Sequence, residues 1–120
     1  MKKSLVSVRH ALNGIWYAVS SERNIKIQLA AFVLAMAAAF TLSISRLEML
    51  AILGISALVF SLELTNTAVE RLADRVSSEH DALIRVVKDI MAGAVLMASL
   101  FAVIIGITIF IGPLMRLLHR

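Results

Sequence analysis

The chain contains no cysteine, a single proline and few aromatic residues, which make up 6% of its 120 positions. Without cysteine it has no disulfide framework, no cysteine-ligated metal site and no thiol nucleophile. Charged residues are also scarce, at 17%, whereas 60% of the residues are hydrophobic and the mean hydropathy is +0.90. A soluble domain of this size needs a larger polar surface to cover its core. The composition excludes a disordered segment and a multidomain enzyme, and it favours the lipid bilayer as the solvent.

Charge is missing from two long stretches and nearly missing from a third. Residues 27–45 and 90–115 carry no charged side chain, and residues 49–69 carry only Glu63. A membrane-spanning helix needs about 20 mostly apolar residues to cross roughly 30 Å of hydrocarbon. We therefore predict an all-α membrane protein with three transmembrane helices. The three predicted spans are residues 25–45, 49–69 and 90–114.

The N-terminal segment follows a different pattern. Between about residues 4 and 21, apolar side chains recur every three or four positions opposite polar ones, which predicts an amphipathic helix. Trp16 suits the headgroup layer, so we expect this helix to lie in the membrane interface, with packing against other protein as the alternative. Polar residues interrupt any stretch that resembles a removable signal peptide. Since no repeat or linker is present, we expect one domain over residues 1–120.

The distribution of lysine and arginine predicts the orientation. Nine of the 12 basic residues flank the predicted spans on one side, in the N-terminal segment and between the second and third spans, and three lie on the other side. Because cytoplasmic loops are enriched in basic residues, we expect the N-terminus in the cytoplasm. This topology and contact with anionic headgroups explain the net charge of +4, and no nucleic-acid partner is expected.

Acidic residues are concentrated on the same side. Seven of the eight fall in the cytoplasmic half of the predicted topology, and only Glu48 lies on the other side. Four residues fall within about 80° of one another on an ideal helix and form one polar stripe: Glu63, Asn66, Glu70 and Asp74. Glu63 and Glu70 are about 10 Å apart along the axis. We therefore place Glu63 near the hydrocarbon boundary and Glu70 near water.

The other two spans bring charged groups to the same depth. Glu22 precedes the first span, and Lys88 and Asp89 precede the third. A carboxylate at headgroup depth, such as Glu63, can accept a proton from a lipid hydroxyl. Glu22 and Glu70 offer the oxygen ligands that Mg²⁺ prefers beside substrate phosphates, and Lys88 can neutralise phosphate charge. Phosphoryl transfer requires these parts.

The connection between the second and third spans, roughly residues 71–87, is polar. Ser77 or Ser78 is expected to cap a short helix that begins near Glu79. Neither this connection nor the rest of the chain contains a G-x-x-x-x-G-K-[ST] loop, a G-x-G-x-x-G turn or an H-E-x-x-H helix. The standard nucleotide cradles and zinc hydrolases are therefore excluded.

Two blocks of sequence carry a family resemblance. The run ELTNTAVE at residues 63–70 is followed by Asp74, by Lys88-Asp89 and by AGAVL at residues 92–96. With ERNIKI at residues 22–27 before the first span, this pattern resembles the prokaryotic diacylglycerol kinase and undecaprenol kinase family. The resemblance covers about residues 8–112 in order and spacing. Its most specific part is the E-x-x-N-[ST]-A-[IV]-E block with a downstream K-D.

The resemblance implies a small lipid kinase of the bacterial plasma (inner) membrane that uses ATP and Mg²⁺. It also implies a homotrimer whose active sites are shared between neighbouring subunits. Glu63 would be the catalytic base, and Asn66 would help to arrange the base and the lipid hydroxyl. Glu22 and Glu70 would be the ligands of Mg²⁺ bound with ATP. The implied nucleotide site also includes Glu79, His80, Asp81, Lys88 and Asp89.

The lipid substrate stays open between diacylglycerol and undecaprenol. The ERNIKI segment is more similar to the undecaprenol branch, but Gln28 stands where that branch often has histidine. Two other classes of protein are alternatives to a kinase. A small proton-coupled transporter would use one membrane glutamate, although it would commonly need a fourth span and an acid near the midplane. In a noncatalytic membrane subunit, Glu63 and Asn66 would hold helices together by hydrogen bonds.

Overall fold

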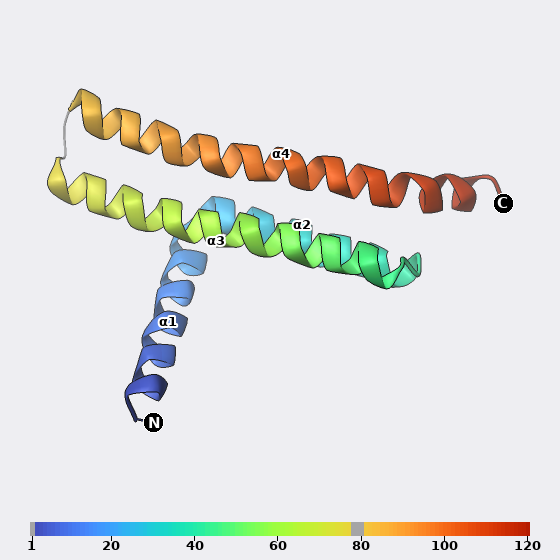
Figure 1. Cartoon of the computed structure of the whole chain (residues 1–120), viewed down its shortest axis with the longest axis horizontal. Helices are drawn as coiled ribbons and strands as arrows, with labels where there is room; N and C mark the ends of the chain where they lie inside the picture. Colours follow the sequence, from blue (N-terminus) through green and yellow to red (C-terminus); the bar gives the residue numbers. More distant parts are fainter. Residues whose placement is uncertain (1, 78–80) are drawn as a thin grey trace.

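A computed structural model describes residues 2–77 and 81–120 of the chain, which form four α-helices and, over these residues, no strand (Figure 1). Their bounds are Lys2–Ser21 for α1, Arg23–Thr41 for α2, Arg46–Val76 for α3 and Ala82–Leu118 for α4. The prediction of an all-α membrane protein is confirmed. The first predicted span corresponds to α2, which ends four residues earlier than expected, and the other two lie inside α3 and α4.

Three helices run side by side, and the fourth leaves them at a steep angle (Figure 1). α3 and α4 are antiparallel and share the most extensive contact, and α2 packs against α3. α1 joins α2 through the single residue Glu22 and contacts both α2 and α3. We call the end where α2 begins, α3 ends and α4 begins the site end. The opposite end, where α2 turns into α3, is the turn end.

Most large apolar side chains on these helices point away from the protein. Leu34 is 70% exposed, Phe40 71% and Leu96 60%. Each of α2, α3 and α4 is long and apolar enough to cross a membrane. Burial of these faces in hydrocarbon is favourable, whereas their exposure to water would cost about 25 cal/mol per Å² of apolar surface. The pattern fits helices whose outer faces contact lipid or other membrane-embedded protein.

At the turn end, backbone groups at the end of α2 and at the start of α3 form local hydrogen bonds. Ser43 has a positive φ of 52°, and the two N–H groups that follow the helix end, those of Ser43 and Ile44, donate to the carbonyls of Phe40 and Ala39. This is the Schellman arrangement, which pairs the last carbonyls of a helix. Ser45 and Glu48 then form a reciprocal capping box at the start of α3.

The apolar core lies toward the turn end. Ala39, Ile52 and Ile109, one residue from each spanning helix, are buried together. Ile44 packs against this cluster and couples the turn to the core. The small residue at position 39 lets α2 approach its neighbours closely, as small residues do in membrane helices. This cluster joins the three spanning helices near the turn end, and other buried apolar side chains, including Ile25 and Ala73, lie toward the site end.

Candidate active site

The inward face of α3 changes character along its length. Nearer the turn end its buried residues are Ile52 and Val59, and nearer the site end they are Glu63, Thr67 and Ala73. The first four lie four or seven residues apart, so they follow one face of the helix. The Thr67 hydroxyl donates to the backbone carbonyl of Glu63 at 3.0 Å, which satisfies the buried hydroxyl locally. Glu63 is therefore the first ionisable group that the inward face presents toward the site end.

Glu63 is only 3% exposed, although it is an ionisable residue in a predicted span. Among the described residues, no side chain makes a hydrogen bond to its carboxylate. Glu22 and Glu70 lie close enough for their charges to act on it. A buried carboxylate without a partner, beside like charges, is costly in a membrane protein. Such a group is retained for function more readily than for stability.

Asn66 also has an unsatisfied atom. Its side-chain amide donates to Oε1 of Glu70 at 3.4 Å, which ties it to one of the predicted metal ligands. Its carbonyl oxygen Oδ1 is buried and has no hydrogen-bond partner. A buried unpaired acceptor costs free energy unless a ligand or water satisfies it. Asn66 therefore offers a free acceptor one helical turn from Glu63, in the direction of the site end.

Glu22 pairs with Arg71, one of the basic residues that lie between the second and third predicted spans. The Arg71 guanidinium donates to Oε1 of Glu22 at 2.7 Å and to the hydroxyl of Tyr17 at 3.1 Å. The guanidinium also lies 5.9 Å from the centre of the Tyr17 ring. Three helices meet at this point, because Tyr17 is in α1, Glu22 precedes α2 and Arg71 is in α3. No motif in the sequence indicated this contact.

Lys88 and Asp74 form the second ion pair of the described residues, between α4 and α3. Their side chains are 37% and 56% exposed, so the pair faces water. The Lys88 ammonium has three donors, so in its predicted role it can bind a phosphate beside Asp74 or in its place. Asp89 is exposed on α4 next to Lys88. The structure brings both residues to the site end, as the sequence predicted.

The polar connection differs from its predicted form. Ser77 ends α3, and α4 begins at Ala82 with Asp81 as its N-cap, so the prediction that Ser77 caps a helix starting near Glu79 was wrong. The Asp81 carboxylate accepts hydrogen bonds from the backbone N–H groups of Leu83 and Ile84. It therefore caps α4 in this structure. Ser78 and the predicted nucleotide-site residues Glu79 and His80 lie outside the described residues.

The described carboxylates at the site end are too few to hold a metal ion alone, so a bound ion would need further ligands such as substrate phosphates and water. Over residues 2–77 and 81–120, no three histidine or acidic side chains are grouped closely enough to hold a metal ion by themselves. Glu22 precedes α2 and Glu70 lies in α3, and both are close enough for their charges to act on Glu63. Mg²⁺ commonly takes one or two carboxylates and completes its shell with water and substrate phosphates. The pair fits that second arrangement.

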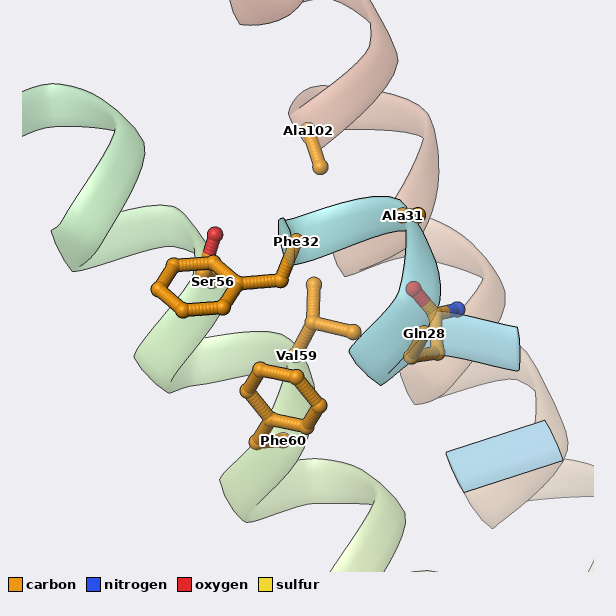
Figure 2. A pocket seen from close by; sticks show the side chains of 7 residues that line it. All are labelled: Gln28, Ala31, Phe32, Ser56, Val59, Phe60 and Ala102. Atoms are coloured by element: carbon orange, nitrogen blue, oxygen red, sulfur yellow. The ribbon is translucent and has the colours of Figure 1, made fainter. Parts of the chain in front are cut away.

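A small pocket lies on the turn-end side of Glu63, between α2, α3 and α4 (Figure 2). It measures about 100 Å³, and its wall includes Val59, one turn from Glu63 on the same face. The rings of Phe32 and Phe60 meet edge to face at 5.9 Å and form an aromatic wall. Gln28 supplies the main polar group and donates to Ser99 at 3.4 Å. The buried carboxylate thus stands between an apolar pocket and the charged site end.

The sequence model described as prokaryotic diacylglycerol kinase matches residues 9–110 of the chain. The chain belongs to the prokaryotic diacylglycerol kinase family. It is 36% identical over 105 residues to the undecaprenol kinase of Bacillus subtilis (strain 168), across 88% of this chain and 85% of that protein. It is 37% identical over 115 residues to a diacylglycerol kinase of Synechocystis sp. (strain ATCC 27184 / PCC 6803 / Kazusa), across 95% of this chain and 66% of that protein.

Family membership confirms the resemblance found in the sequence and makes the chain a membrane lipid kinase. The transporter and noncatalytic alternatives are therefore set aside. The family model spans the buried Glu63, the two predicted Mg²⁺ ligands and the Lys88–Asp89 pair.

Proposed function

We propose that this chain transfers the γ-phosphoryl group of ATP to the hydroxyl of diacylglycerol or undecaprenol. The observation that carries the proposal is Glu63, a buried carboxylate without a hydrogen-bond partner among the described residues. It lies between an apolar pocket and a cluster of charged side chains. A lipid alcohol has the same division, with an apolar chain on one side of its hydroxyl and water on the other.

Glu63 acts in this proposal as the general base. As the lipid oxygen attacks the γ-phosphorus, its proton passes to the Glu63 carboxylate, and the bond between the γ-phosphorus and the bridging oxygen of ADP breaks. Burial supports this role because it keeps water, a competing acceptor for the phosphoryl group, away from the base. The free carbonyl oxygen of Asn66 can accept a hydrogen bond from the substrate and orient it beside the base.

Glu22 and Glu70 are the proposed ligands of Mg²⁺ bound with ATP. When bound, Mg²⁺ would neutralise the negative charge of the β- and γ-phosphates during transfer. Lys88 would bind phosphate beside Asp74 or in its place, and Asp89 lies next to Lys88 on α4. The proposed nucleotide site also includes residues of the polar connection: Glu79, His80 and Asp81.

The arrangement in the cell is also a proposal. Residues 1–120 form one domain in the bacterial plasma (inner) membrane, with the N-terminus in the cytoplasm. The bias of basic residues supports this orientation, because it puts the site end on the side where ATP is found. The family resemblance suggests a homotrimer with shared active sites. The long exposed apolar faces of α2 and α4 are available for contacts between subunits as well as with lipid.

The two relatives do not select the lipid, because they are named for different substrates and are almost equally similar to this chain. The decisive experiment incubates the purified protein in mixed micelles with labelled ATP and Mg²⁺. Separate reactions contain diacylglycerol, undecaprenol, a short prenol and no lipid. We expect a labelled lipid phosphate from one or both of the long-chain substrates, and none when Mg²⁺ is chelated.

The short prenol tests whether an apolar chain is needed, because it presents a hydroxyl with little to bind in the membrane. Hydrolysis of ATP without lipid phosphate would show that the acceptor is water, and transfer to none of the lipids would refute the proposed function. Equal transfer to the short prenol and undecaprenol would show that only the hydroxyl is recognised.

A further inference from the structure

Arg71 joins two groups on either side of the break between α1 and α2. Tyr17 lies one turn before the end of α1, and Glu22 is the single residue between the helices. Glu22 has an extended backbone conformation, with φ −110° and ψ 121°. A non-helical residue between two helices allows their relative direction to change. Arg71 reaches across from α3 and contacts both sides of this break.

Glu22 is the N-cap residue of α2, yet its side chain does not cap that helix. Serine, threonine, aspartate and asparagine are the residues that cap a helix from this position, and the longer glutamate is not among them. The Glu22 carboxylate instead bonds to Arg71 at 2.7 Å. This ion pair turns the carboxylate toward α3, the helix that carries Glu63 and Glu70.

The ion pair is poorly suited to a purely stabilising role. The side chains of Arg71 and Glu22 are 44% and 24% exposed, and ion pairs in contact with water contribute little to stability. Its geometry is nevertheless specific, because the planar guanidinium donates to two different partners, Tyr17 and Glu22, at once. Orientation of Glu22 is the property that this geometry controls.

We infer that Arg71 is a positioning residue for the Glu22 carboxylate, which it holds toward the cation site and links to α1 through Tyr17. The inference rests on the proposed function, in which Glu22 is a ligand of Mg²⁺. When a divalent cation binds with nucleotide, Glu22 can contact it with one oxygen while Arg71 keeps the other in place. Residues that orient a metal ligand in this way typically change metal affinity or activity by about 10- to 100-fold when removed.

The test uses the full chain in detergent micelles and compares Arg71→Gln, Arg71→Lys and Tyr17→Phe with Arg75→Gln. Arg75 lies one turn further along α3, is exposed and takes part in neither ion pair of the described residues. Binding of Mn²⁺ in the presence of a nonhydrolysable ATP analogue is measured by electron paramagnetic resonance, which requires no turnover. The Mg²⁺ concentration for half-maximal kinase activity and kcat are measured in parallel.

For Arg71→Gln we expect Mn²⁺ binding to weaken and the half-maximal Mg²⁺ concentration to rise, each about tenfold, with a smaller change in kcat. Arg71→Lys keeps the positive charge but lacks the planar guanidinium that donates in two fixed directions, so we expect an intermediate change in Mn²⁺ binding and in the half-maximal Mg²⁺ concentration. Tyr17→Phe removes one acceptor but keeps the ring, and its shift should be smaller than that of Arg71→Gln. Arg75→Gln should resemble the wild type.

Two results would overturn the inference. Cation binding that is unchanged in both Arg71 variants would show that Arg71 only attaches α1 to the other helices. In that case we expect the fluorescence anisotropy of Trp16, which lies in α1, to fall because α1 moves more freely. Tighter cation binding would show that Arg71 competes with the cation. If Arg71→Gln does not fold, Arg71→Lys decides in the same way. Glu22→Gln separates the two hypotheses, because an unchanged cation requirement in that variant refutes the proposed metal ligand itself.

Discussion

Helix α3 carries three glutamates, and two of them, Glu48 and Glu63, lie in very different surroundings. Glu48 lies at the turn end, where its side chain and that of Ser45 exchange hydrogen bonds with the backbone at 3.1 and 3.2 Å. Glu63, about 22 Å further along the helix axis, is buried and has no such partner among the described residues. The first glutamate has its partners within four residues, whereas the second has none among the described side chains and contacts the lipid hydroxyl only in the proposed mechanism.

The difference extends to the surroundings of each residue. At the turn end, the Schellman arrangement and the capping box pair the free backbone groups, and the apolar cluster lies beside them. At the site end, Asn66 has an unpaired oxygen, and both ion pairs are open to water. The polar groups of the turn end thus have local partners, whereas polar groups of the site end are unpaired or form ion pairs exposed to water. In the proposed mechanism, the groups at the site end rearrange around the substrate.

The largest expected effect separates the two glutamates directly. Glu63→Gln keeps the size of the side chain but removes its ability to accept a proton, so we expect kcat to fall by about 10²- to 10⁴-fold. Glu48→Gln is the matched control, because glutamine also completes a capping box, and its kcat should stay near the wild-type value. Both are measured with the preferred lipid at saturating ATP and Mg²⁺.

Stability provides the second half of this comparison. Because Glu63 is buried without a partner, its replacement by a neutral residue should leave the fold intact, with an unchanged or raised resistance to unfolding in detergent. Near-normal turnover by a folded Glu63→Gln would remove the general-base assignment. A similar loss of turnover in Glu48→Gln would show that the two ends are not separate.

Several parts of this division follow from the sequence alone. The spacing of Glu63, Asn66 and Glu70 determines that they share a face of α3, because helical periodicity fixes relative direction within one element. The lack of charge in the spans predicts which segments cross the membrane. The Arg71 contact with Tyr17 and Glu22 was not predicted, since it depends on the angle at which α1 leaves α2, and no periodicity within a helix encodes that angle.

The caps illustrate a second limit. Ser77 and Asp81 are both good capping residues, and sequence preference cannot say which of them begins α4. In the structure Ser77 ends α3, and Asp81 caps α4. Similarly, Lys88 and Asp74 were both recognised as charged residues at the site end, but their pairing depends on the register of α3 against α4. Packing between helices, which a single sequence does not display, determines both results.

A smaller effect is expected at the Lys88–Asp74 pair. If Lys88 binds a phosphate of ATP, Lys88→Gln should raise the KM for ATP about tenfold, because a hydrogen bond between charged groups is lost. Asp74→Asn is the matched variant, since it breaks the same ion pair but leaves the cation free, and its KM should be unchanged or lower. Initial rates at varied ATP and fixed lipid measure both. Equal increases in the two variants would mean that the ion pair itself, as a link between α3 and α4, is what the site requires.

The smallest effect is expected at the turn end. Ser45→Ala removes the side chain that accepts from the Glu48 N–H and should lower the free energy of unfolding by about 1 kcal/mol, with kcat and both KM values unchanged. Ser45→Thr retains a capping hydroxyl and should lie near the wild type. Reversible unfolding by sodium dodecyl sulfate in mixed micelles measures the stability, and the lipid kinase assay measures the rest. Because the turn end holds no group that contacts substrate in the proposed mechanism, a loss of activity in Ser45→Ala larger than its loss of folded protein would show that the turn reaches the site through α3.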